Sequence, residues 1–151
     1  MNTAPTQADP AQTRRRAWMA VLARAGRDEL ECLIESADTP AYTMPRAAQT
    51  GLCMVRGRMG GSGRPFNLGE MTLTRCVVQL ADNTTGVAYV AGRDRRQAEL
   101  AALADALLQS GRLDPAPVAE LERRPAQPRS ERPAQVAATR VDFFTLVRGE
   151  D

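Results

Sequence analysis

A glycine-rich loop flanked by arginines carries the residue types in this chain that are best suited to binding an anion. Closely spaced glycines allow positive φ angles, so successive N–H groups can converge on phosphate or phosphonate oxygens, and guanidinium groups add charge-assisted hydrogen bonds. The loop has neither the Gly-Lys-Ser/Thr ending of a P-loop nor the spacing of a dinucleotide fingerprint, so a plain strand connection or a subunit contact remains an open alternative. On any of these interpretations we expect Gly60 or Gly61 to need a positive φ. The candidate residues are Arg58, Gly60, Gly61, Gly63 and Arg64.

Two further arginines, Arg75 and Arg93, belong to the same candidate phosphate-binding or interface set. Arg75 lies in a segment of alternating apolar and polar residues, where an arginine either reaches solvent at an edge or points toward a partner. The alternative for both is a solvated arginine or one paired within the chain. Asp94 has the position of a helix N-cap, which accounts for this carboxylate without a catalytic role.

The C-terminal block combines adjacent aromatic side chains with charged ones. Two neighbouring phenylalanines exceed what a single packing face uses, so they predict an anchor on a partner, surrounded by a polar rim. The alternative is a terminal helix packed on its own domain, and the pattern of residues 136–147 fits a helix and a strand. The candidate docking residues are Arg140, Asp142, Phe143, Phe144 and Arg148.

Composition excludes several kinds of catalysis. The chain contains no histidine, and all of its 20 cations are arginine. Histidine-activated nucleophiles, histidine metal sites and Schiff-base lysines are therefore ruled out, and we predict no catalytic residue and no metal ligand in this chain. A formal net charge of +2 over 151 residues is too small to indicate a nucleic-acid binder.

The cysteines and the apolar runs indicate the compartment. Cys32, Cys53 and Cys76 are odd in number and widely spaced, so we expect buried free thiols in a reducing environment. The N-terminal residues lack the apolar region of a signal peptide, and the longest apolar run, Ala17–Ala23, is far too short to span a membrane. These features predict a cytoplasmic protein.

Hydrophobic periodicity predicts an α+β fold. The helical pattern first appears over about residues 13–25, with Gly26 as the terminating glycine, and a second helix is capped by Asp28 and Glu31. A third, amphipathic helix is capped by Asp94 and Gln97 and ends at Gly111. The strand candidates are 52–59, 72–81 and 87–91, with a weaker fourth at 42–46, and a short helix is possible near 116–123.

This pattern predicts an antiparallel sheet of three to four strands, packed with an N-terminal helical hairpin and the central helix. We divide the chain into a disordered leader (1–12), an α+β core domain (13–114), a connection rich in proline and charge (115–135) and a C-terminal docking arm (136–151).

Several blocks of the sequence are shared with one known family. They are Arg46-Ala47-Ala48 with Thr50-Gly51, Arg58 to Gly63, Leu73-Thr74-Arg75, Gly92-Arg93-Asp94 and Val136 to Gly149. In these blocks the chain resembles PhnG, one of the components of the bacterial carbon–phosphorus lyase core complex. Its stretch from Pro115 to Pro133 is more broken than the helix expected there in that family.

The resemblance implies a subunit of a multi-subunit enzyme of phosphonate catabolism, needed for transfer of a phosphonate to C1 of the ATP ribose with release of adenine. It implies subunits H, I and J as partners, with K and L bound transiently, and neither nucleic acid nor membrane. ATP with magnesium would be a substrate of the complex, and no cofactor would be bound by this chain alone. The alternatives are a scaffold that only stabilises the complex and a stand-alone anion- or nucleotide-binding domain.

Overall fold

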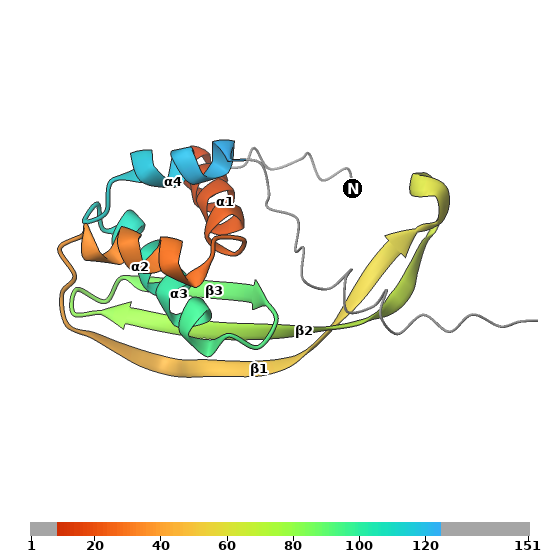
Figure 1. Cartoon of the computed structure of the whole chain (residues 1–151), viewed down its shortest axis with the longest axis horizontal. Helices are drawn as coiled ribbons and strands as arrows, with labels where there is room; N and C mark the ends of the chain where they lie inside the picture. The colour runs from red at the N-terminus through yellow and green to blue at the C-terminus, as the bar shows by residue number, and fades with distance from the viewer. Residues whose placement is uncertain (1–8, 125–151) are drawn as a thin grey trace, which may run out of the picture.

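The computed structural model describes residues 9–124, in which helices cover one face of an antiparallel sheet (Figure 1). The predicted α+β class is confirmed. None of the helices in this range is long and apolar enough to cross a membrane. The elements are α1 (Pro10–Leu22), α2 (Arg27–Glu35), β1 (Tyr42–Arg58), the short 3-10 turn η1 (Met59–Gly61), β2 (Pro65–Leu80), β3 (Thr85–Ala91), α3 (Arg95–Gln109) and α4 (Pro115–Arg123).

The sheet has the strand order β1-β2-β3, and its strands differ greatly in length. β1 pairs with β2 along its whole length, from Tyr42 opposite Leu80 to Arg58 opposite Pro65. β3 pairs only with residues 73–79 of β2. The remaining parts of β1 and β2 therefore project beyond β3 as a two-stranded ribbon, residues 52–72 (Figure 1).

The weak strand predicted at 42–46 and the strand predicted at 52–59 are parts of one element. β1 runs through both, with register shifts after Thr43 and after Arg46 where β1 holds an extra residue opposite β2. Such bulges bend a strand without ending it. The break between the two predicted strands therefore reflects bulges between Thr43 and Gln49 in a continuous strand.

The core lies between the sheet and α3. Alternate residues of β2 are buried beneath the helix, as the period of a strand requires. α3 is buried along most of its length because α1 and α2 cover the sides that the sheet leaves open. The predicted cap of α3 is confirmed, since Asp94 accepts a hydrogen bond from the Gln97 N–H at 3.0 Å, and Gly111 follows the helix with a φ of 71°.

The boundary between the first two helices differs from the prediction. α1 ends at Leu22, and Gly26 has a φ of −68°, so it is not a left-handed terminating glycine. Gly26 is instead the N-cap of α2, and its N–H donates to the Glu29 carboxylate at 2.8 Å. Asp28 lies inside the first turn of α2, where its negative charge interacts favourably with the helix dipole but does not cap the helix.

The proline-rich segment after α3 begins with a packed helix. Asp114 accepts a hydrogen bond from the Ala116 N–H at 2.9 Å, and Pro115 occupies the first turn, where its missing N–H costs nothing. Val118 is buried against the core. The short helix expected near 116–123 is therefore present as α4, beside α1 (Figure 1).

One fully buried carboxylate, that of Asp105 in α3, joins elements that are distant in sequence. Its oxygens accept hydrogen bonds from Arg15 at 2.8 Å and from the Trp18 indole N–H at 2.9 Å, both in α1. The backbone N–H of Val87 in β3 donates at 3.0 Å, and the Gln109 amide donates at 3.1 Å. The charge is thus paired and its lone pairs are used, which is the condition for burying a carboxylate.

Replacing Asp105 with alanine should lower the free energy of unfolding by about 3–5 kcal/mol, because the Arg15 charge and three further donors lose their buried acceptor. Urea unfolding followed by circular dichroism measures this change. Asp38→Ala is the matched control, since Asp38 is 89% exposed and its ion pair with Arg112 spans 3.5 Å. This variant should lose less than about 1 kcal/mol in the free energy of unfolding. Equal losses in the two variants would contradict the role of Asp105.

Gly86→Ala should also destabilise the fold, by about 3 kcal/mol, because β3 lies directly on the α3 backbone there. A Cβ at Gly86 would meet the Ala102 carbonyl oxygen and would lie 2.6 Å from the Ala106 nitrogen. Gly51→Ala is the control, since a Cβ at Gly51 has nothing within 4 Å. Unfolding midpoints that move equally in both variants would show that strand propensity, and not this contact, sets the cost.

Candidate functional site

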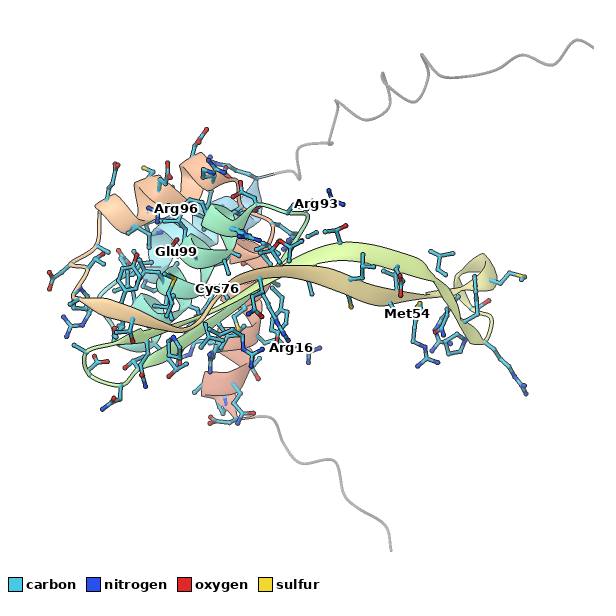
Figure 2. The ribbon with its side chains drawn as sticks, turned by 90° about the horizontal axis from the view of Figure 1, so that it is seen from below. Arg16, Met54, Cys76, Arg93, Arg96 and Glu99 are labelled. Atoms are coloured by element: carbon cyan, nitrogen blue, oxygen red, sulfur yellow. The ribbon has the colours of Figure 1, made fainter. Side chains whose placement is uncertain are left out.

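The ribbon is the most distinctive surface of the described residues. Figure 2 shows it extending away from the helices, with Met54 on its outer half. Large apolar side chains along it are exposed to solvent, where an isolated soluble domain usually carries polar residues. They are Leu52, Met54, Met59, Phe66, Leu68 and Met71.

Strand pairing assigns these side chains to two faces. Cys53 lies opposite Met71, and Gly57 lies opposite Phe66, so alternation places Cys53, Val55 and Gly57 on one side. A Cβ at Gly57 would lie 3.8 Å from the Leu68 side chain and 3.9 Å from the Phe66 ring, so both side chains lie over this glycine. We call Cys53, Val55, Phe66, Leu68 and Met71 the apolar face.

The opposite side of the ribbon is mixed in character. Leu52 lies opposite Thr72, Met54 opposite Glu70, and Arg56 opposite Asn67. This mixed side continues the sheet face covered by α3, whereas the apolar face continues the sheet face that no described helix crosses (Figure 1).

The glycine-rich loop forms the tip of the ribbon. Gly60 and Gly61 have φ values of 60° and 79°, which confirms the expected positive φ. The loop also closes on itself, since the Gly63 N–H donates to the Met59 carbonyl at 3.0 Å and Arg58 donates to the Gly63 carbonyl at 3.1 Å. These turn requirements account for the glycines, and anion binding by Arg58 and Arg64 stays a prediction.

A short series of hydrogen bonds stabilises the place where the ribbon leaves the body, meaning the helices and the three-stranded part of the sheet. We call this place the root. The buried Thr74 hydroxyl donates to the Gly92 carbonyl at 2.8 Å and lies 3.1 Å from the Thr50 hydroxyl. Since the Thr74 proton goes to Gly92, Thr50 is the donor to Thr74. Three separate blocks that carry the family resemblance thus meet at the root, and Figure 2 shows Arg93 beside it.

Asp94 follows Arg93 and ties the root to α2. Its carboxylate accepts from the Gln97 N–H and forms an ion pair with Arg27 at 2.8 Å. The hydrogen bond from Gln97, supported by the Arg27 guanidinium, holds the pKa of Asp94 below its ordinary value in spite of partial desolvation. These contacts give the carboxylate a structural role.

The structure does not bring all the predicted phosphate-binding residues together. Arg75 lies on the uncovered face of the sheet, opposite Tyr89 of β3, and its guanidinium is 3.4 Å from the Gln49 amide oxygen. Ten residues of extended β2 separate Arg75 from Pro65 next to the tip, which corresponds to roughly 30 Å. Arg75 and Arg93 therefore belong to the body, and the glycine loop to the far end of the ribbon.

The expectation of three buried cysteines is wrong for two of them. Cys76 is buried, and burial raises the pKa of its thiol, which keeps it protonated. Cys53 is exposed on the ribbon and Cys32 is exposed on α2, because each lies on a side of its element that the core does not cover. All three are free thiols.

Sequence reasoning also missed the polar cluster around Tyr42. The Tyr42 hydroxyl donates to Glu99 at 2.8 Å, and Arg96 donates to the same oxygen at 3.0 Å. Burial and the bond to Glu99 raise the pKa of the Tyr42 hydroxyl. Among residues 9–124, no group of three or more potential ligand side chains is placed to hold a metal ion.

The predicted docking residues of the C-terminal block lie outside the described residues. Arg140, Asp142, Phe143, Phe144 and Arg148 all follow residue 124. Their role as a partner anchor stays a prediction.

Comparison with known proteins resolves the family. A family model described as phosphonate metabolism protein PhnG matches residues 13–149. This chain belongs to the PhnG family. It is 43% identical over 155 residues to the α-D-ribose 1-methylphosphonate 5-triphosphate synthase subunit PhnG of Rhizobium meliloti (strain 1021), over 100% of this chain and 99% of that protein. The PhnG match includes the root, the ribbon and the C-terminal block.

The lowered pKa of Asp94 predicts a specific pH dependence. Because its pKa is lower in the folded chain than in the unfolded one, ionised Asp94 stabilises the fold above the unfolded-state pKa, and this contribution is lost as pH falls through the folded-state pKa. Asn also caps helices well, so Asp94→Asn should remove mainly the charge-dependent part. The variant should be less stable than wild type at pH 7 by under about 1 kcal/mol.

The free energies of unfolding of wild type and Asp94→Asn should then converge from roughly pH 4 downward. Thermal unfolding at a series of pH values measures the convergence. A difference between the two proteins that is the same at every pH would contradict the charged role of Asp94.

Proposed function

We propose that this chain is a subunit of α-D-ribose 1-methylphosphonate 5-triphosphate synthase, acting in phosphonate catabolism. The observation that carries the proposal is the full-length identity of 43% with the Rhizobium meliloti protein that bears this description. The match to the PhnG family model over residues 13–149 supports it independently of that one relative.

The reaction we propose for the whole enzyme transfers a phosphonate to the ribose of ATP. A phosphonate oxygen forms a bond to C1 of the ribose, and the bond from C1 to the adenine nitrogen breaks. Adenine takes the bonding electron pair and a proton as it leaves, and the triphosphate stays on the other end of the ribose. We propose that this chain works with subunits H, I and J, and transiently with K and L.

The role of this chain within the enzyme is assembly and positioning. Two carboxylates that could be considered for a catalytic role have structural partners instead. Asp105 pairs with Arg15, and Asp94 caps α3. An uncovered sheet face and a projecting apolar ribbon suit a chain that fits against other subunits.

A scaffold that contacts no substrate is the second candidate function, and the self-closed hydrogen bonding of the tip loop favours it. The paired substitution Arg58→Ala and Arg64→Ala separates the two possibilities. A scaffold predicts an unchanged KM for ATP and for the phosphonate in the assembled enzyme, whereas an anion-binding tip predicts a rise of about tenfold or more in one of them.

Adenine release tests the proposed function directly. The purified chain should release no adenine from ATP and methylphosphonate by itself, and a mixture of the other subunits should regain the reaction when the chain is added. Chromatographic measurement of free adenine is the readout, with heat-unfolded chain as the control. Release by the chain alone, or an equal rate from the other subunits without it, would contradict the proposal.

A further inference from the structure

We propose that the apolar face of the ribbon docks into a cleft of another subunit of the synthase, and that this cleft is apolar with carboxylates along its border. The inference rests on the proposed function, since it takes the partner to be a subunit of the same enzyme. It assigns the contact to one face of one hairpin and states the chemistry that the partner must present.

The first argument is exposure without a covering element. Leu68 is 65% exposed and Phe66 is 42% exposed, although both belong to a continuous apolar strip with Met71 and Val55. Gly57 of β1 has no side chain, so the Leu68 and Phe66 side chains of β2 can both lie over it. Aromatic and branched apolar groups gathered in this way have the composition of an interface centre and not of a solvated strand.

The second argument is the geometry of the hairpin. Beyond β3 the ribbon has only two strands, and within the described residues no helix packs on its outer half (Figure 2). A two-stranded hairpin with no packed face is marginally stable in water, so a covering partner would stabilise it. Met71 on the apolar face and Met59 at the tip add unbranched side chains that adapt their shape to a partner surface.

The third argument is charge. Residues 39–81 contain five arginines and a single acid, Glu70. The ion pairs within residues 9–124 use arginines outside this segment, at positions 15, 27, 96, 112 and 124. The segment's arginines, at positions 46, 56, 58, 64 and 75, are all exposed. Arg58 and Arg64 lie at the tip end of the apolar strip, and Arg75 lies on the uncovered sheet face that the strip continues. A partner that meets them with carboxylates gains complementarity, and this defines the border of the cleft.

The same charges argue against a second copy of this chain as the occupant. In a two-fold contact the same surface lies on both sides, so the ribbon arginines of one copy would approach those of the other. Like charges placed together cost several kcal/mol in an interface. We therefore assign the cleft to a different subunit.

Thiol labelling tests the docking in the wild-type chain. Cys53 is exposed on the apolar face, Cys32 is exposed on α2, and Cys76 is buried, so a maleimide reagent reports on the ribbon and on the body separately. Assembly with the other subunits should slow Cys53 labelling by about 30-fold or more, as expected for a group buried in an interface. Mass spectrometry assigns the labelled cysteine.

A matched pair of substitutions tests the face. Leu68→Glu should weaken assembly by about 30-fold or more, because it buries a carboxylate in an apolar contact beside an acidic border. Leu52→Glu places the same charge on the mixed side at nearly the same exposure, 68% against 65%, and should change the affinity by less than about threefold. Circular dichroism of the isolated variants verifies that both are folded.

The remaining results of these two experiments each contradict one part of the proposal. Equal weakening by Leu68→Glu and Leu52→Glu, or assembly that leaves Cys53 fully reactive, would overturn the docking inference while the proposed function stands. A wild-type chain that does not join the other subunits would contradict the proposed function itself. Protection of Cys53 in the isolated chain would identify another occupant: a second copy if it rises with concentration, or the chain's own C-terminal block if truncation after Gln135 abolishes it.

Discussion

The arrangement of the body depends on the burial of one charge. Asp105 lies in residues 100–108 of α3, which are otherwise apolar and alanine-rich, and a carboxylate in that position is tolerated only when its oxygens are fully hydrogen-bonded. Arg15 and Trp18 satisfy it from α1, and the Val87 N–H satisfies it from β3. These hydrogen bonds to Asp105 therefore fix where α1 lies against α3 and where α3 lies on the sheet.

Placing α1 and α3 in this way leaves the sheet with two unlike faces. The helices gather on the side of Thr74 and Cys76, and the side of Arg75 and Tyr89 has no described helix across it (Figure 1). The ribbon prolongs this asymmetry beyond the body, and its apolar face belongs to the uncovered side. The Thr50–Thr74–Gly92 hydrogen bonds at the root join β1 and β2 to the residues that precede α3.

Local sequence chemistry was sufficient for features that depend on a few neighbouring residues. The cap at Asp94, the glycine after α3 and the positive φ at Gly60 follow from backbone preferences, and the structure has all of them. Gly26 was misread because a glycine between two helices can end the first or cap the second, and only the position of Glu29 decides. The exposed Cys53 was misread because alternation shows that a strand has two sides without showing which side is covered.

The sequence by itself determined the family, the α+β class and the turn chemistry of the tip, because each is encoded in contiguous residues or in periodic patterns. Tertiary structure alone decided that residues 52–72 leave the body as a ribbon, since this follows from β3 being shorter than its neighbour β2. It alone also separated Arg75 and Arg93 from the glycine loop, and it brought Asp105 to Arg15 across 90 residues of chain. Such contacts depend on which surfaces meet after folding, and no local spacing in the chain specifies them.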